Sequence, residues 1–143
     1  MIFVDTGAWF SAFVPNDPHH AKALDWLQQN EQPLITTDYV LDELLSLMKV
    51  RGEFQRSLSL VRRFLSEPLL ARLHFITPDE FNAAVEVFRR FQDQQWSFTD
   101  CVSYALIKRF GINTAFAIDH HFRQFGTVTV VPDLSLKKSR RPR

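Results

Sequence analysis

The 143-residue chain contains one cysteine, four glycines and no long apolar run. A single cysteine, Cys101, cannot form an intramolecular disulfide, so the fold does not depend on an oxidising compartment. No segment reaches the roughly 18–20 consecutive apolar residues of a membrane-spanning helix, and no basic, cleavable leader pattern follows Met1. We therefore expect a cytoplasmic protein that makes no membrane contact.

The scarcity of glycine and cysteine argues against two kinds of site, a glycine-rich phosphate loop and a Cys/His zinc site. Four glycines provide no G-x-G-x-x-G or Walker-type loop for a nucleotide phosphate, and no Cys/His set has zinc spacing. The chain is also too short for two ordinary domains of about 100–200 residues each. We predict one domain over residues 1–132, followed by a basic, disordered tail over residues 133–143.

The formal net charge of +1 hides an uneven distribution. Five of the seventeen basic residues lie in the last seven positions: Lys137, Lys138, Arg140, Arg141 and Arg143. Such a run can contact nucleic-acid phosphates without reading their sequence. Residues 1–136 contain the other twelve basic residues and all sixteen acidic ones, which gives them a net charge of −4. The placement of this acidic excess is therefore the main indication of function.

Short apolar runs alternate with amphipathic segments along the chain. We predict strands at residues 2–4, 33–36, 72–76, 114–118 and 127–131. Helices are predicted at residues 8–14, 19–30, 38–51, 54–65, 78–94, 97–111 and 120–124. This alternation indicates an α/β fold, a three-layer α/β/α sandwich with a central parallel sheet of about five strands. In such a sheet, ligands bind at the carboxyl ends of the strands.

Four acidic residues are candidates for a site at that edge. Asp5 and Asp119 directly follow the first and fourth predicted strands, so a parallel sheet brings both to the same edge. Glu43 has apolar residues three positions before and four after it, and we expect it to lean towards the core. Asp100 lies in the first turn of its helix, where the helix dipole favours a negative charge.

Each acidic residue also has a simpler structural explanation. Asp5 and Asp119 can be N-caps of the helices that they precede. Asp100 can complete a Ser-x-x-Asp capping box, and Asp42 rather than Glu43 can be the solvent-facing member of its pair. Capping does not explain Glu43, however. A cluster of carboxylates favours a bound cation, and Mg²⁺ keeps positions open for a phosphate oxygen and an attacking water.

The order of these motifs resembles the PIN domain family and, within it, the VapC-type toxins of toxin–antitoxin pairs. The resemblance covers nearly all of residues 1–132. Its motifs are Ile2-Phe3-Val4-Asp5-Thr6, Thr36-Thr37-Asp38-Tyr39-Val40-Leu41-Asp42-Glu43-Leu44-Leu45, Ser97-Phe98-Thr99-Asp100, Ala117-Ile118-Asp119-His120-His121-Phe122 and Gly126-Thr127-Val128-Thr129-Val130-Val131-Pro132.

The resemblance implies a Mg²⁺- or Mn²⁺-dependent endoribonuclease, with an acidic site formed by Asp5, Glu43, Asp100 and Asp119. It implies that Asp5 and Asp100 ligate the metal directly. Glu43 and Asp119 then complete the coordination through water or position the nucleophile. Thr6 and Thr99 resemble the hydroxyl residues that flank the family's acids. An RNA substrate, a cognate antitoxin and a homodimer are also implied.

Two other functions remain open. A catalytically silent PIN-like module would bind RNA or protein, and its acids would only cap helices. A phosphate-accepting receiver-like or phosphatase domain is disfavoured, because Asp5-Thr6-Gly7 lacks a second aspartate two residues on.

Histidine and cysteine offer further candidates for chemistry. The pairs His19-His20 and His120-His121 invite a metal or acid–base role, but we predict that they are ordinary surface residues. Cys101 is predicted to be a small buried residue and not a nucleophile.

Overall fold

The computed structural model describes residues 1–66 and 70–134. Its strands are β1 (Ile2–Val4), β2 (Leu34–Thr37), β3 (Arg72–His74), β4 (Thr114–Phe116) and β5 (Thr129–Val131). Its helices are α1 (Thr6–Phe13), α2 (His20–Gln29), α3 (Asp38–Val50), α4 (Phe54–Ser66), α5 (Pro78–Arg90), α6 (Phe98–Phe110) and α7 (His121–Gln124). Of the predicted tail, residues 133–143, only residues 133 and 134 are described, so its five basic residues lie outside the described ranges.

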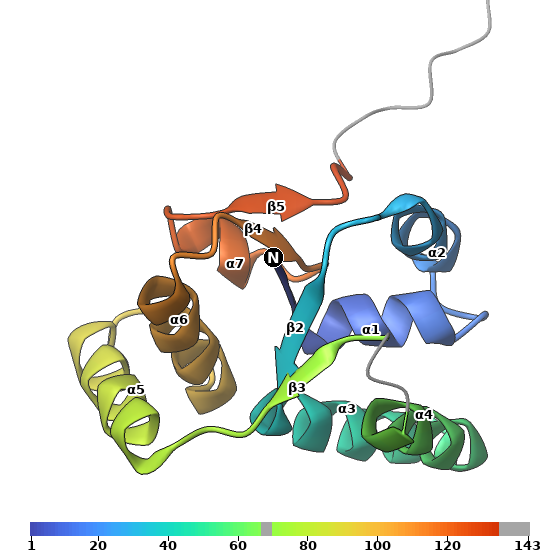
Figure 1. Ribbon diagram of the computed structural model, residues 1–143, viewed down its shortest axis with the longest axis horizontal. Coiled ribbons are helices and arrows are strands. Elements are labelled where there is room, and N and C mark those ends of the chain that lie inside the picture. The colour runs from blue at the N-terminus through green and yellow to red at the C-terminus, as the bar shows by residue number, and fades with distance from the viewer. Residues whose placement is uncertain (67–69, 135–143) are drawn as a thin grey trace, which may run out of the picture.

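The strands form one parallel sheet in the order β3-β2-β1-β4-β5. Helices α5 and α6 lie to one side of the sheet, and α1 and α2 lie to the other (Figure 1). The predicted α/β/α sandwich is therefore confirmed. No helix within the two described ranges is both long enough and apolar enough to cross a bilayer.

Strands β3, β4 and β5 are shorter than predicted, because each includes only residues that pair with a neighbouring strand. Pairing of β2 with β3 stops at Thr37 and His74. The chain then leaves the sheet, and the Ile76 amide donates to Asp38 Oδ1 at 3.0 Å. Pairing of β4 with β5 likewise begins at Thr114 and Thr129. The predicted extensions to residues 76 and 118 and from residue 127 are therefore wrong.

Local sequence signals determine several helix ends. The Thr37 side chain accepts a hydrogen bond from the Val40 amide and caps α3. Gly52 and Gly111 follow the ends of α3 and α6 with positive φ angles of 77° and 62°, a conformation that costs glycine little. These ends agree with the sequence prediction.

A buried polar contact ties together the elements that support the carboxyl end of β1. Trp9 Nε1 donates to Thr36 Oγ1 at 3.2 Å, and Thr36 Oγ1 donates to the Val4 carbonyl at 3.0 Å. Trp9, Thr36 and Val4 are completely buried. These bonds hold α1, β2 and β1 in register directly beside Asp5, the residue that follows β1.

Candidate metal centre

Asp5 is the most buried of the four candidate acids. It lies between β1 and α1, and 5% of its surface is exposed. Although Asp5 occupies the N-cap position of α1, its side chain makes no capping hydrogen bond. Capping therefore does not account for its carboxylate.

The electrostatic surroundings of Asp5 are also acidic. Burial raises the pKa of Asp5 well above its usual value, and the charge of Asp100 raises it further. The Thr6 backbone amide lowers this pKa, while Glu43 and Asp119 add to the increase. All three other candidate acids therefore lie close enough to Asp5 to repel its charge. The fold brings together four acids from separate segments of the chain.

Asp100 lies in the first turn of α6 and is 7% exposed. Its Oδ2 accepts a hydrogen bond from the Ser97 amide at 2.9 Å, and Ser97 Oγ accepts one from the Asp100 amide at 3.1 Å. The predicted capping box is confirmed. The same Oδ2 lies 2.9 Å from Nδ1 of His121. Asp100 thus has a structural role as well as a place in the acidic cluster.

Replacing Ser97 with Ala is expected to lower the free energy of unfolding by about 1 kcal/mol, because an N-cap hydroxyl is lost. Urea unfolding of the metal-free protein measures the change. The control is Ser59→Ala, which removes an exposed hydroxyl from the middle of α4 and should have little effect. Equal stabilities for the two variants would contradict a stabilising role for the capping box.

Glu43 is exposed, so the expectation that it leans into the core is wrong. The buried residues of α3 are Val40, Leu41, Leu44 and Met48. Successive helical residues are about 100° apart around the helix axis. Glu43 therefore lies beside the buried face that these four residues form, and not within it. Asp42 is exposed as well. Because Glu43 still raises the pKa of Asp5, it belongs to the solvent-facing side of the cluster.

Asp119 lies three residues after the end of β4 and begins the turn into α7. Its side chain is 45% exposed. Its Oδ1 accepts a hydrogen bond from the His121 amide at 3.0 Å. The N-cap residue of α7 is His120 and not Asp119, so the N-cap explanation is wrong in detail although the carboxylate does stabilise the turn.

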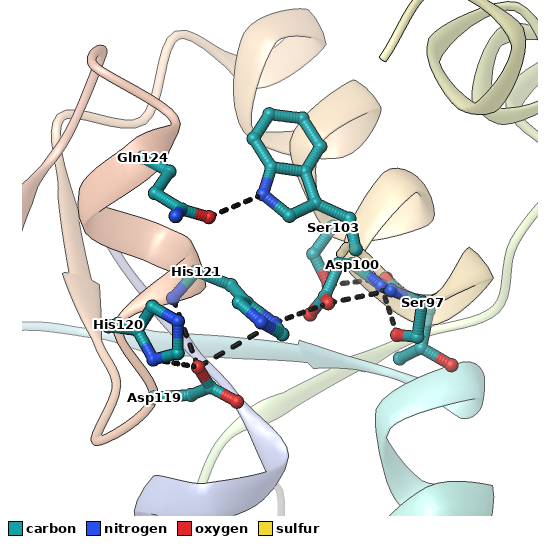
Figure 2. A network of polar contacts seen from close by, with 9 residues as sticks. Ser97, Asp100, Ser103, Asp119, His120, His121 and Gln124 are labelled. Atoms are coloured by element: carbon teal, nitrogen blue, oxygen red, sulfur yellow. Dashed lines mark hydrogen bonds and ion pairs between the residues drawn. The ribbon is translucent and has the colours of Figure 1, made fainter. Parts of the chain in front are cut away.

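His121 is a site residue that the sequence analysis missed. Its ring lies between Asp119 and Asp100 (Figure 2), with Nδ1 3.6 Å from Asp119 Oδ1 and 2.9 Å from Asp100 Oδ2. The side chain is 18% exposed. The prediction of an ordinary surface residue is therefore wrong for His121. The sequence did contain one indication of this role, because His121 lies two residues after Asp119, the acid that follows the fourth strand.

The hydroxyl next to Asp5 lacks a protein partner. Thr6 Oγ1 is buried and has no hydrogen-bond partner among the described residues. A buried hydroxyl without a partner costs free energy, so this atom fits a site in which a ligand or water supplies the bond. The Thr99 side chain is half-buried, and the Thr99 backbone carbonyl accepts a bond from Ser103 Oγ at 3.0 Å. A site role for Thr99 stays a prediction.

The donor set fits a hard divalent cation. Carboxylate oxygens are the ligands that Mg²⁺ and Mn²⁺ prefer. A bound cation would offset both causes of the raised pKa of Asp5, the burial of its charge and the repulsion from the neighbouring acids. The only cysteine nearby is unsuited to chemistry: Cys101 is 1% exposed, and burial, with Asp100, raises its thiol pKa to about 11. The prediction that Cys101 is a small buried residue is confirmed.

Comparison with known proteins shows the family of this chain. The model of the PIN domain family matches residues 2–128. The chain belongs to the PIN domain family. It is 29% identical over 133 residues to the 23S rRNA-specific endonuclease VapC20 of Mycobacterium tuberculosis, an alignment that covers 93% of this chain and 100% of that protein. It is 24% identical over 137 residues to ribonuclease VapC26 of the same species, covering 92% and 100% of the two chains.

Solved structures of PIN proteins have the same fold. The crystal structure of Mycobacterium tuberculosis VapC20, described as a sarcin-ricin loop cleaving toxin, matches with a TM-score of 0.83 at 28% identity. This match covers 90% of the present chain and 97% of VapC20. FitAcB from Neisseria gonorrhoeae matches with a TM-score of 0.69 at 15% identity, covering 95% of the present chain and 100% of that chain. At this identity the match shows a similar fold only.

Proposed function

We propose that this PIN protein is a metal-dependent endoribonuclease and the toxin of a type II toxin–antitoxin pair. The proposal rests on one observation. Asp5 is a buried carboxylate whose pKa is raised by burial and by the charges of Asp100, Glu43 and Asp119. The relatives named as an rRNA-specific endonuclease and a ribonuclease support RNA as the substrate class. We assign the activity to the domain formed by residues 1–132.

Asp5 and Asp100 are the proposed direct ligands of Mg²⁺ or Mn²⁺. Both carboxylates are largely buried, so the surrounding fold holds them in place before the ion arrives. The exposed Glu43 and Asp119 face the solvent from which RNA and water approach, and they hold the coordinated waters or position the nucleophile. Thr6 Oγ1, which has no partner among the described residues, is available to orient a water beside Asp5.

Water is the proposed nucleophile. Cys101, the cysteine beside Asp100, is excluded by its burial and by a thiol pKa raised to about 11. When bound, a divalent ion lowers the pKa of water and stabilises charge on the phosphodiester. The chain itself contributes carboxylates that would orient the water towards the phosphorus atom and accept its proton.

A toxin of this kind acts on RNA in the cytoplasm and is held inactive by a cognate antitoxin. The chain is also proposed to form a homodimer, as the family resemblance implies. Expression of the chain alone in bacteria is expected to arrest growth, whereas the Asp100→Asn variant at equal abundance should not. Growth arrest by both proteins would show that toxicity does not depend on the acidic site.

The direct test is cleavage by the purified protein. Incubation with ribosomal or total RNA and Mg²⁺ or Mn²⁺ is expected to give discrete internal fragments, and a chelator should prevent their formation. Mapping the new ends by primer extension distinguishes endonucleolytic cuts from exonuclease trimming. Intact RNA at every metal concentration would contradict the proposal and favour a silent binding module.

A further inference from the structure

Two imidazole rings face the exposed carboxylate of Asp119. His120 Nδ1 lies 3.3 Å from Asp119 Oδ1, and His121 Nδ1 lies 3.6 Å from the same oxygen. The ring centroids of the two histidines are 4.7 Å apart. One potential ligand atom from each of the three residues lies within 4.8 Å of the others. Figure 2 shows both rings beside the Asp119 carboxylate.

These distances suit a small coordination sphere. In a tetrahedral site with bonds of about 2.0–2.1 Å, neighbouring ligand atoms are about 3.3 Å apart. The observed oxygen–nitrogen distances of 3.3 and 3.6 Å are close to this value. One ligand atom from each of the three residues lies within 4.8 Å of the others, so binding an ion requires the two imidazole rings to turn towards it. The side chains of Asp119 and His120 are 45% and 75% exposed, so an ion reaches them without any opening of the fold.

The chemistry of the donors differs from that of the buried carboxylates. Mg²⁺ prefers oxygen ligands, whereas imidazole nitrogen favours borderline ions such as Zn²⁺ and Co²⁺. Ligation through Nδ1 of His121 replaces its hydrogen bond to Asp100 Oδ2, which is 2.9 Å long. Occupancy of the histidine pair would therefore remove one of the two contacts of Asp100 Oδ2 and leave the one from the Ser97 amide. Asp100 is the proposed ligand on the buried side of the cluster.

We propose that Asp119, His120 and His121 form a binding site for a borderline divalent ion of the Zn²⁺ and Co²⁺ class. The site lies at the exposed rim of the carboxylate cluster, and Asp119 belongs to both. The inference deepens the proposed function, because an ion held there occupies a residue of the proposed catalytic site and changes the partners of Asp100. Zn²⁺ then regulates the site, whereas Mg²⁺ or Mn²⁺ supports hydrolysis.

The test is Co²⁺ titration of the metal-free protein without RNA, followed by the visible absorption of nitrogen-ligated Co²⁺. Equimolar Zn²⁺ is expected to displace the signal, whereas Mg²⁺ displaces it only at a large excess, because the two sites share Asp119. His120→Ala should weaken Co²⁺ binding by about 10-fold or more, the scale seen when groups supporting a metal site are lost. His19→Ala, which removes a histidine from the other pair, should bind like the original protein.

Equal Co²⁺ affinity in His120→Ala and His19→Ala would overturn the inference, as would displacement of Co²⁺ by Mg²⁺ at similar concentrations. Circular dichroism checks that both variants are folded, which is expected because the His120 side chain is largely exposed. No RNA is present, so a failure to bind Co²⁺ leaves the proposed nuclease activity standing. A protein that binds Co²⁺ and never cuts RNA refutes only the proposed function.

Discussion

Replacing Asp5 with Asn is expected to abolish RNA cleavage while stabilising the metal-free protein. Loss of a direct ligand removes charge stabilisation of several kcal/mol from the transition state, which corresponds to a rate loss of about 100-fold or more. Stability should rise because the amide has the shape of the carboxylate without its charge. In the original protein, burial and the charges of Asp100, Glu43 and Asp119 all disfavour the ionised form of Asp5.

Asp42→Asn is the matched control. Asp42 is exposed and adjacent to the proposed site residue Glu43, so its substitution changes the same net charge at a position outside the cluster. Cleavage rate and melting temperature should both stay near those of the original protein. Full cleavage activity in Asp5→Asn would place the nuclease site elsewhere, and a lower melting temperature would contradict the predicted cost of burying this charge.

The pH dependence of stability provides a second measurement on Asp5. Because its folded-state pKa is raised, the folded protein retains a proton that the unfolded chain releases near pH 3.9, the approximate reference value for aspartate. The contribution to stability is therefore complete below that pH and is lost as the pH rises through the folded-state pKa. Urea unfolding with a chelator should show this loss in the original protein, and Asp5→Asn should lack it.

Saturating Mn²⁺ or Mg²⁺ is expected to raise the melting temperature of the protein. An ion at 100 times its dissociation constant stabilises the folded state by about 2.7 kcal/mol if the unfolded chain does not bind it. For a chain of 143 residues this corresponds to an increase on the order of 10 °C. Differential scanning fluorimetry before and after addition of a chelator measures the shift and its reversal.

Variants show whether the ion responsible for this shift is bound by the acidic cluster. Asp100→Asn should lose most of the stabilisation, and Asp42→Asn should keep it. A silent PIN-like module, in which the acids only cap helices, should show no ion-dependent shift in any form. Equal shifts in Asp100→Asn and Asp42→Asn would place the stabilising ion at a different site.

Local sequence patterns were sufficient for most of the fold. Alternating apolar and amphipathic segments indicated the five strands and seven helices found in the described residues. The Ser97–Asp100 capping box and the glycine after α6 also formed as predicted. These features depend on residues a few positions apart, because hydrogen bonds at helix ends and the side-chain periods of helices and strands are local. The position of Asp5 directly after a buried strand is also a local feature, which the sequence shows without the tertiary structure.

The sequence by itself therefore determined the α/β architecture and which acids follow its strands. Only the tertiary structure decided that Glu43 is exposed and that His121 lies 2.9 Å from Asp100, 21 positions earlier in the chain. The helical period predicts the side of a helix on which a side chain lies. It does not predict which other helix or strand packs against that side. The acidic cluster depends on such long-range packing, and so does the raised pKa of Asp5.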